Sequence, residues 1–514
     1  MSTLRTLARW ARDLNPADLP PAVRVRARLQ HLSTAGAVRA VRARPVATRL
    51  AGTAEGKTAP LVPGGRGRVR DAVRVHAGLA AWLSYDDMLF SGRTSPGAVS
   101  AAWAGARGHT LDELICATVA ANEIAGRVGC SLLLSSNGGE VSAAVHAVGA
   151  ATALGLLSGL DAETLAHALA LALSAPSVVP LSVSLGGGDG PALAAALSAA
   201  AGAEAVTLAA AGLRGPLDLL DARDGLLHSL AWTPLRAAFT GLGRTWLTET
   251  LSYKLTPGSI WHQPAVQGVA EILRRHVKAA DKRLGVDQLE RVEVAIGAPG
   301  YAQEQVMAEH TALDPATVPL SLRRSIAVEV VSYGLGPEQL EEGWLEQNRD
   351  ELSEIARRVE VSHSWRHTLA LVDHLVDVAA PLLAGLTLPE LRAAGQGAAR
   401  HLGVGLPAPT GAALLDVLRA RPDRLFDRLR HSSGDLGDAR LLEWQFQLGA
   451  SIKLYTTRGG SWPEERALPE GSPGWPWDQT VAGVLRKSGL PQAAALLDAP
   501  GAEDGLGFVE TLLG

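Results

Sequence analysis

The stretch Ser84-Tyr85-Asp86-Asp87-Met88-Leu89-Phe90-Ser91-Gly92-Arg93-Thr94-Ser95-Pro96-Gly97-Ala98-Val99 joins two expected helices. The apolar run at residues 76–83 predicts the end of the first helix, and the second is expected to begin at Gly97. Adjacent carboxylates such as Asp86 and Asp87 repel each other, so burying either one requires hydrogen-bond donors or a nearby cation. A polar loop held by rigid helices is a natural place for a site, although a solvated helix end gives the same pattern.

Length and composition favour a helical protein of more than one domain. The chain has 514 residues, of which 47% are hydrophobic and only 4% aromatic, with a formal net charge of −4. Such a length exceeds one hydrophobic core, and the near-neutral charge argues against a nucleic-acid partner. Cys116 and Cys130 have no metal-ligand spacing with a histidine pair, so we expect a reducing, cytoplasmic setting.

No signal peptide and no membrane span are expected. Residues 1–12 lack an apolar core, and Leu4 and Leu7 fall at the spacing of an amphipathic helix. The Ala-rich run at residues 192–203 is too short and too weakly apolar to cross a bilayer, and Glu204 is expected to end it.

The hydrophobic pattern changes in the second half of the chain. Helical patterns dominate residues 69–251. Alternating apolar and polar residues then predict three strands, at Leu289–Ile296, Arg358–Ser362 and Ser451–Thr457. The pattern predicts a mainly-α fold, with a large all-helical domain and a smaller inserted α+β domain.

The glycine run at residues 185–190 allows two interpretations. Glycine-rich loops can cradle phosphates when a strand precedes them and Lys-Ser/Thr follows. Neither feature is present here, so a flexible connection is favoured.

Several short motifs occur in the order found in one enzyme family. They are Asp18-Leu19-Pro20, Leu83-Ser84-Tyr85-Asp86-Asp87, Asn122-Glu123-Ile124, Arg127-Val128-Gly129, Leu156-Leu157-Ser158-Gly159-Leu160-Asp161, Lys254 with Pro257, Ser321-Leu322 before Ile326-Ala327, and Pro469-Glu470-Gly471-Ser472-Pro473. In order and spacing they resemble the MmgE/PrpD family, which includes 2-methylcitrate dehydratase, cis-aconitate decarboxylase and iminodisuccinate epimerase. The resemblance covers most of the chain, except that residues 365–448 form a longer segment than the family usually has.

The resemblance implies a helical domain and a smaller α+β lid with the active site between them, usually in a homodimer. It implies a small-molecule substrate and neither a metal nor an organic cofactor. Family members act at a carbon next to a carboxylate, where a base removes a proton and water, carbon dioxide or an inverted stereocentre results. The expected domains are residues 1–265 for the helical part, 266–460 for the lid with its enlarged insertion at 365–448, and 461–514 for a segment that returns to the helical part.

This sequence departs from the family pattern at several site positions. The departures are Ser84 in place of Asp, Met88 in place of Thr, Thr94 in place of His, Glu140 near the position of a second His, Pro191 near the position of a Lys, and Arg324 in place of Tyr. Each charge-assisted bond lost with a cation is worth about 1.5–3 kcal/mol. We therefore predict a substrate with fewer carboxylates than citrate-like acids and a larger, more apolar body.

The candidate site combines retained and altered positions. The candidate catalytic residues are Lys254, Asp86, Glu140 and His262. The candidate substrate-binding residues are Ser84, Tyr85, Asp87, Met88, Thr94 and Arg324. For each of them a structural role in packing, loop order or surface solvation is the alternative.

Two classes of function follow from these residues. The first is a cofactor-free lyase or isomerase that performs dehydration, epimerisation or cyclisation in specialised metabolism. The second is a catalytically inactive family member that acts as a binding or scaffold protein, because a fold does not by itself carry an activity.

Overall fold

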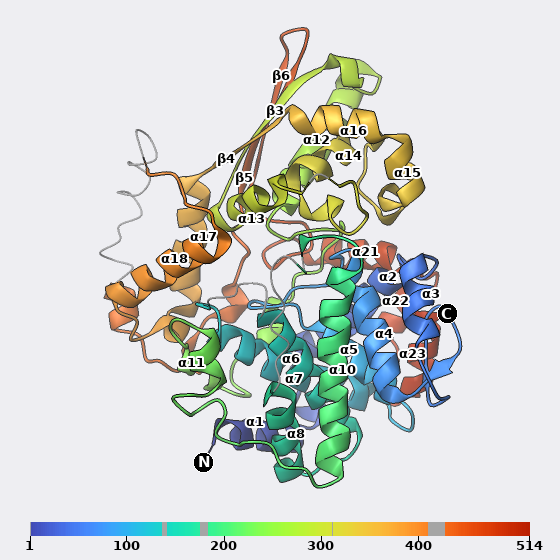
Figure 1. Cartoon of the computed structure of the whole chain (residues 1–514), viewed down its shortest axis with the longest axis vertical. Helices are drawn as coiled ribbons and strands as arrows, with labels where there is room; N and C mark the ends of the chain where they lie inside the picture. The colour runs from blue at the N-terminus through green and yellow to red at the C-terminus, as the bar shows by residue number, and fades with distance from the viewer. Residues whose placement is uncertain (1, 136–140, 175–182, 184, 311, 410–426) are drawn as a thin grey trace.

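The computed structural model describes residues 2–135, 141–174, 183, 185–310, 312–409 and 427–514. It consists of a helical body and a lid built on a four-stranded sheet, which lies above the body in Figure 1. Helices predominate and the sheets are small, so the predicted mainly-α fold with an α+β part is confirmed.

The helical body is formed by the first half of the chain and the C-terminal segment. Its elements are α1 (Thr3–Asp13), α2 (Pro21–Arg39), α3 (Pro45–Gly52), α4 (Val69–Trp82), α5 (Ser95–Gly105), α6 (Leu111–Ser131), α7 (Val141–Leu157), α8 (Ala162–Ser174), α10 (Gly190–Ala210), α11 (Leu226–Leu230), the strands β1 (Ala59–Pro60) and β2 (Arg66–Gly67), and the C-terminal helices α21 (Trp477–Ser488), α22 (Ala493–Leu497) and α23 (Gly505–Leu513). Three short 3-10 turns precede the lid: η2 (Arg236–Phe239), η3 (Leu247–Thr250) and, near the N-terminus, η1 (Pro16–Asp18).

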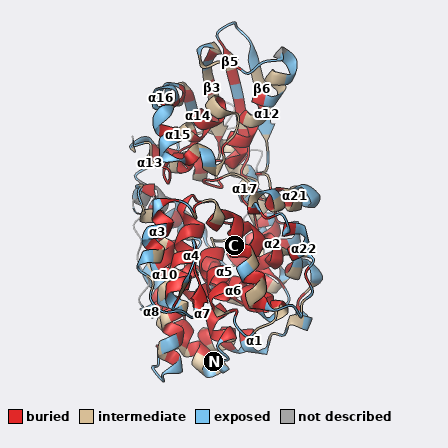
Figure 2. Ribbon diagram, turned by 90° about the vertical axis from the view of Figure 1, so that its right-hand side faces the viewer, coloured by how far each residue is buried: buried red, intermediate tan, exposed pale blue. Residues whose placement is uncertain are grey.

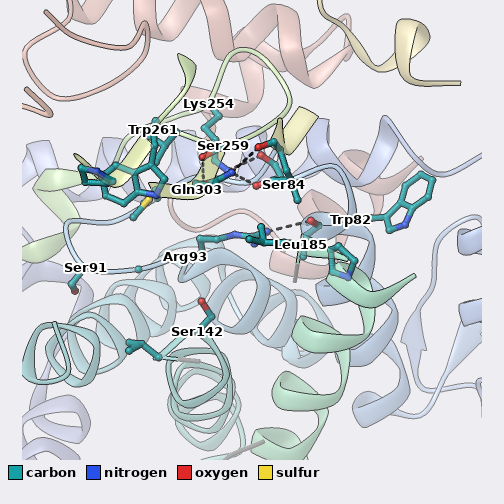
Figure 3. Close-up of a pocket in the computed structure, with 18 of the residues that line it drawn as sticks. Trp82, Ser84, Ser91, Arg93, Ser142, Leu185, Lys254, Ser259, Trp261 and Gln303 are labelled. Atoms are coloured by element: carbon teal, nitrogen blue, oxygen red, sulfur yellow. Dashed lines mark hydrogen bonds between the residues drawn. The ribbon is translucent and has the colours of Figure 1, made fainter. Parts of the chain in front are cut away.

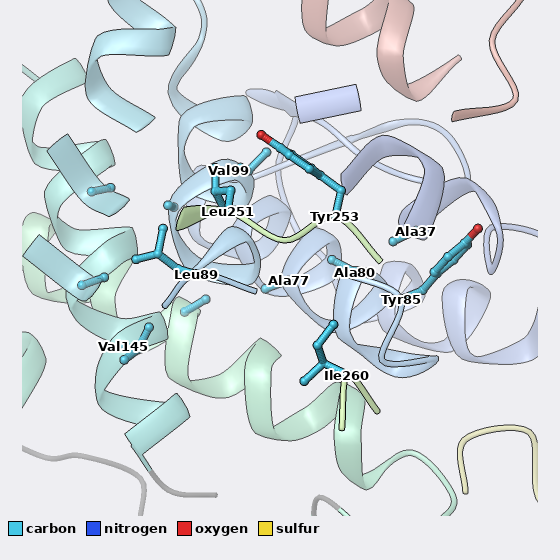
Figure 4. Close-up of a cluster of buried hydrophobic side chains, with 14 of the residues drawn as sticks. Ala37, Ala77, Ala80, Tyr85, Leu89, Val99, Val145, Leu251, Tyr253 and Ile260 are labelled. Atoms are coloured by element: carbon cyan, nitrogen blue, oxygen red, sulfur yellow. The ribbon is translucent and has the colours of Figure 1, made fainter. Parts of the chain in front are cut away.

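Small side chains allow the central helices of the body to pack closely. A Cβ atom on Gly97 would lie 2.3 Å from the carbonyl oxygen of His146, so α5 can approach α7 only because this position is glycine. Helix α5 begins at Ser95, slightly before the expected Gly97. The interior of the body is buried throughout (Figure 2), and one buried cluster lies directly against the loop after α4, as Leu89, Leu251 and Ile260 show in Figure 4.

Helix α10 differs from the expectation for its Ala-rich run. It continues through Glu204, whose side chain lies at the helix surface and pairs with Arg70 at 3.0 Å. Its 21 residues make it, among the described residues, the one helix long and apolar enough to cross a membrane. It packs along α4 and α7, and 56% of its most apolar window is buried, as in a core helix of a bundle.

The lid sheet has the strand order β4-β3-β5-β6. Its strands are β3 (Leu289–Ile296), β4 (Val359–His363), β5 (Ala450–Thr456) and β6 (Ser461–Arg466). β3 is parallel to β4, with Val292 opposite Val359, and antiparallel to β5, with Val294 opposite Ile452. The helices of the lid are α12 (Gln263–Ala280), α13 (Ala298–Ala308), α14 (Leu322–Ser332), α15 (Glu342–Gln347) and α16 (Arg349–Arg357), with the turns η4 (Val286–Gln288), η5 (Val318–Leu320) and η6 (Pro337–Leu340).

Strand β6 was not expected from the sequence. It is an edge strand that contains Pro463, and its residues alternate between exposed and half-buried, so it lacks the apolar alternation that marks β3. Because β6 pairs with β5, the sheet continues past the expected lid boundary at residue 460.

The insertion, residues 365–448, runs from the lid back to the body. It contains α17 (Trp365–Ala379), η7 (Ala380–Leu383), α18 (Leu388–Leu402), η8 (Leu436–Asp438) and η9 (Leu441–Glu443). The amide of Leu436 donates to Thr240 Oγ1 at 2.7 Å, and Trp444 packs edge-on against Phe90 with ring centroids 4.6 Å apart. The insertion therefore contacts the loop after α4 through Trp444; its helices α17 and α18 lie to the left in Figure 1.

Backbone contacts hold the lid on the body on the side of the glycine run. The amide of Gly188 donates to Asp314 Oδ2 at 3.2 Å, and Ser259 N donates to Pro319 O at 3.2 Å. Gly258 has φ +116°, and a Cβ atom there would lie 2.2 Å from Pro319 O, so only glycine permits this approach. The glycine run thus contacts the lid.

Candidate functional site

A cavity of about 380 Å³ lies between the helical body and the lid. Its described lining residues are Ala81, Trp82, Ser84, Met88, Ser91, Gly92, Arg93, Val141, Ser142, Leu185, Pro191, Lys254, Ser259, Ile260, Trp261, Pro299, Ala302, Gln303 and Leu320. Figure 3 shows Arg93 between Ser142 and the pair formed by Lys254 and Ser84. Arg93 and Lys254 are the charged side chains of this described wall.

The loop after α4 presents Ser84 to the cavity in a left-handed backbone conformation. Ser84 has φ +49°, which is uncommon for a residue other than glycine and is maintained by surrounding contacts. Its carbonyl accepts hydrogen bonds from Gly258 N at 3.2 Å and from Lys254 Nζ at 2.6 Å. The loop is therefore tied to the segment that carries Lys254.

Lys254 is almost fully buried and lies beside the charged centre of the site. Its Nζ donates to Ser84 O at 2.6 Å, Ser84 Oγ at 3.1 Å and Gly258 O at 3.2 Å, and lies 3.7 Å from Asp86 Oδ1. Burial lowers the pKa of Lys254 to about 8, although Asp86 raises it, and Arg93 lowers it further. A lysine with such a pKa exchanges protons near neutral pH.

Arg93 and Asp86 form a two-point ion pair next to Lys254. Arg93 Nε donates to Asp86 Oδ2 at 2.7 Å, and Nη2 donates to Asp86 Oδ1 at 2.6 Å and to Ala81 O at 3.2 Å. Asp86 is fully buried; burial alone would raise its pKa, but Arg93 and Lys254 outweigh this and the pKa is lowered. Asp86 is therefore an anion that orients Arg93, and Arg93 itself borders the cavity.

A second layer of polar groups lies behind the loop. Gln30 Nε2 donates to Asp87 Oδ2 at 2.6 Å, and burial raises the pKa of Asp87. Lys487 Nζ, from α21, donates to Tyr85 O at 2.6 Å and to Lys254 O at 3.0 Å. Loss of water around the ammonium lowers the pKa of Lys487, while Asp87 raises it. The C-terminal segment thus joins the two loops that carry the site.

Helix α6 explains why the segment before Lys254 has a fixed path. Glu123 accepts hydrogen bonds from Leu247 N at 3.0 Å and Thr248 N at 2.8 Å, at the start of η3. Arg127, one turn later, donates to Thr240 O at 2.6 Å and lies 3.7 Å from Glu123. These buried side chains satisfy the backbone of the η2–η3 segment, which leads directly to Lys254.

The structure brings only some of the sequence-predicted site residues to the cavity wall. Those that line it are Ser84, Met88 and Lys254. Asp86, Asp87 and Tyr85 lie behind the wall, where Tyr85 OH donates to Leu255 O at 3.2 Å. Glu140 lies outside the described residues.

Three predictions place residues at the cavity that the structure places elsewhere. Thr94 is buried and donates to Asn122 Oδ1 at 2.6 Å, so it supports the loop from inside the body. His262 is buried in the lid with Nε2 3.0 Å from Gly300 O, and burial lowers its pKa. Arg324 donates to Ala312 O at 3.0 Å and does not line the cavity.

Sequence reasoning missed Arg93, Trp261, Gln303 and Lys487. Arg93 stands within the stretch that we singled out, one residue before Thr94, and an arginine beside two buried carboxylates was the available signal. His146 is also buried next to this group; burial and Arg93 lower its pKa to about 3, so it is neutral. Among the described residues, no group of metal-binding side chains comes together in the geometry of a metal site.

Comparison with known proteins identifies the domain to which the helical body is similar. The family model for the MmgE/PrpD N-terminal domain matches residues 5–234, which cover most of the helical body. Residues 5–234 therefore form a domain similar to the MmgE/PrpD N-terminal domain. This similarity suggests a dehydratase-like or lyase-like function. A search of curated proteins finds no match.

Proposed function

We propose that this protein is a cofactor-free lyase or isomerase that transfers a proton at a carbon next to a carboxylate, on a substrate less anionic than citrate-type acids. The observation that carries the proposal is the pairing of Lys254 and Arg93 at one cavity between body and lid. A cation that binds a carboxylate and an amine that titrates near neutral pH are the two groups that such chemistry needs.

The geometry supports a division of labour between these two side chains. Arg93 binds the substrate carboxylate, oriented by Asp86 from behind. Neutral Lys254 accepts the proton of the adjacent carbon, and the electron pair moves into the carboxylate to form an enediolate that Arg93 stabilises. Protonation of the enediolate on its opposite face by a water molecule, with the Lys254 ammonium returning its proton to solvent, gives epimerisation. Transfer of the proton from the Lys254 ammonium to a departing β-hydroxyl group gives dehydration, with water as the product.

The departures from the family pattern support an altered substrate. Ser84, Met88 and Pro191, which stand where the family has Asp, Thr and Lys, all line the cavity. Met88 and Pro191 replace a hydroxyl group and a cation, so fewer anionic groups of a substrate find partners there, whereas Ser84 replaces a carboxylate by a neutral hydroxyl group.

The inactive binding protein remains the second candidate because of one observation. The three hydrogens of the Lys254 ammonium are all accepted by Ser84 and Gly258, an arrangement that also suits a purely structural lysine. The two candidates differ in whether the bound acid exchanges a proton with solvent.

Deuterium exchange measures this difference directly. The protein is incubated in heavy water with a panel of mono-, di- and tricarboxylic acids, and loss of the signal of the hydrogen next to the carboxylate is followed by proton NMR. We expect exchange of a monocarboxylic acid that Lys254→Met abolishes and Arg324→Gln leaves unchanged. Exchange that survives in Lys254→Met contradicts the assigned role, and tight binding with turnover of a tricarboxylate contradicts the altered substrate. Light scattering of the same sample tests the predicted homodimer.

A further inference from the structure

The charge balance around the cavity limits how many carboxylates a ligand can carry. Arg93 and Lys254 contribute two positive charges, and the buried carboxylate of Asp86 contacts both. Behind them, Asp87 and Lys487 act on each other as a pair of opposite charges. While Lys254 is protonated, one uncompensated positive charge is left among the described groups, which matches a single carboxylate. Once Lys254 is neutral, as in the proposed proton transfer, no positive charge among these groups is left for a second carboxylate.

The position of that charge is set by Arg93. Asp86 and Ala81 take its Nε and Nη2 hydrogens, while Nη1 has no acceptor among the described residues. The Arg93 side chain is 24% exposed, against 2% for Lys254. A carboxylate that enters the cavity therefore meets Arg93 first.

Among the described residues, the opposite side of the cavity holds no cation for a second carboxylate. We call this side the lid wall; it consists of Ser259, Ile260, Trp261, Pro299, Ala302, Gln303 and Leu320. Ser259 Oγ donates to Gln303 Oε1 at 2.8 Å and Gln303 Nε2 donates to Leu320 O at 2.8 Å, so the remaining donors of this wall are neutral N–H groups of Trp261 and Gln303. A second carboxylate placed there would lose its water without gaining a counter-charge.

The size of the cavity indicates how large the apolar part of the ligand is. The cavity measures about 380 Å³, whereas a dry cavity of about 150 Å³ is enough to bind benzene. Trp261, held from behind by Phe446 at a centroid distance of 6.5 Å, gives the lid wall a fixed aromatic surface.

We infer that the substrate is a monocarboxylic acid with a ring-sized apolar body, whose carboxylate binds Arg93 and whose body lies against Trp261 and Ile260 on the lid wall. The inference rests on the proposed function and names its substrate class. It places the carbon next to the carboxylate beside Lys254 and Ser84, at the junction of the charged and apolar halves of the cavity.

Calorimetric titration with three simple probes tests this inference. The probes are hydrocinnamate, its neutral counterpart hydrocinnamyl alcohol, and tricarballylate. We expect hydrocinnamate to bind and the other two to bind at least about tenfold more weakly, because one lacks the charge-assisted bond and the other buries unpaired charges. Tighter binding of tricarballylate, or no binding of hydrocinnamate, overturns the inference.

Variants locate the binding energy. In Arg93→Gln, hydrocinnamate and its alcohol are expected to bind equally weakly, whereas Trp261→Ala should weaken both by a similar factor. Arg324→Gln, which removes a cation outside the cavity, is the matched control and should bind as the wild type does. If Arg93→Gln does not fold, as judged by circular dichroism, the comparison of the three probes on the wild type still decides.

The titration and the deuterium exchange can contradict the binding inference and the proposed function independently of each other. A wild-type protein that binds hydrocinnamate but exchanges no proton of any acid contradicts the proposed function and leaves the binding inference standing. A protein that exchanges protons but prefers tricarballylate contradicts the binding inference alone.

Discussion

Two ion pairs between an arginine and a buried carboxylate lie in different surroundings. One is Arg127 with Glu123 on α6, and the other is Arg93 with Asp86 in the loop after α4. The Arg127 side chain is fully buried, and backbone carbonyls of the η2–η3 segment accept its hydrogens. Arg93 is 24% exposed and borders the cavity. The comparison teaches that a buried carboxylate can hold an arginine that fixes the backbone, as at Arg127, or one that stays partly exposed at a cavity, as at Arg93.

Removing the α6 pair is expected to have the largest effect on stability. Glu123→Ala leaves Arg127 buried without its counter-charge and frees the amides at the start of η3, which costs about 3–5 kcal/mol. Urea unfolding measures this loss, with Glu360→Ala on the exposed side of β4 as the control. Equal stability of these two variants would show that the pair does not hold the segment.

Lys487→Met tests how the C-terminal helix α21 supports the loop that carries Arg93 and Asp86 and the segment that carries Lys254. The carbonyls of Tyr85 and Lys254 lose a common donor, so we expect a loss of about 1–3 kcal/mol in unfolding free energy. Because the effect reaches Lys254 through its backbone, kcat should fall more than KM rises, with partial rescue in Lys487→Arg. The neighbouring Arg486→Met should leave both constants unchanged. A change in KM alone would argue against a positioning role.

Asp86→Asn changes the charge of the site at nearly constant shape. Asp86 raises the pKa of Lys254, so its removal should shift the pKa of Lys254 below about 8. Since the neutral amine is the active form, the midpoint of the rising pH–rate curve for deuterium exchange should move to lower pH. At a pH low enough to keep Lys254 protonated, the same variant carries one more net positive charge and should bind succinate more tightly than the wild type. An unchanged midpoint of the pH–rate curve would show that Lys254 is not the base in the observed exchange.

Arg324→Gln is expected to have the smallest effect. This residue lies outside the cavity and donates to one backbone carbonyl, so the change in stability should stay within about 0.5 kcal/mol. Thermal unfolding and the exchange rate both test this expectation. A strong loss of deuterium exchange in this variant would show that Arg324 contacts the substrate, which requires a lid position different from the one described.

The sequence predicted the parts of this molecule that depend on local pattern. Apolar runs located the body helices, of which α5, α6 and α7 are buried on nearly all sides. Alternation located β3, β4 and β5, because each of these strands buries one regular face. Edge strand β6 was missed because both of its faces reach solvent. Short motifs identified two parts of the site, namely the loop at residues 84–88 and Lys254.

The remainder of the site depends on contacts between distant parts of the chain. Lys487 donates to the backbone of Tyr85, 402 positions earlier, and no local pattern predicts such a contact. Thr94 and Arg324 were expected at the cavity by alignment with family positions, but their own side chains find partners elsewhere. Arg93 was missed because a loop arginine reads as solvated until its carboxylate partner is known to be buried.

A crystal structure of the protein with hydrocinnamate tests the central claim most directly. The account predicts the carboxylate on Arg93, the ring against Trp261 and Ile260, and the carbon next to the carboxylate facing Lys254. A ligand bound outside the cavity between body and lid, or one whose carboxylate faces the lid wall, would contradict it.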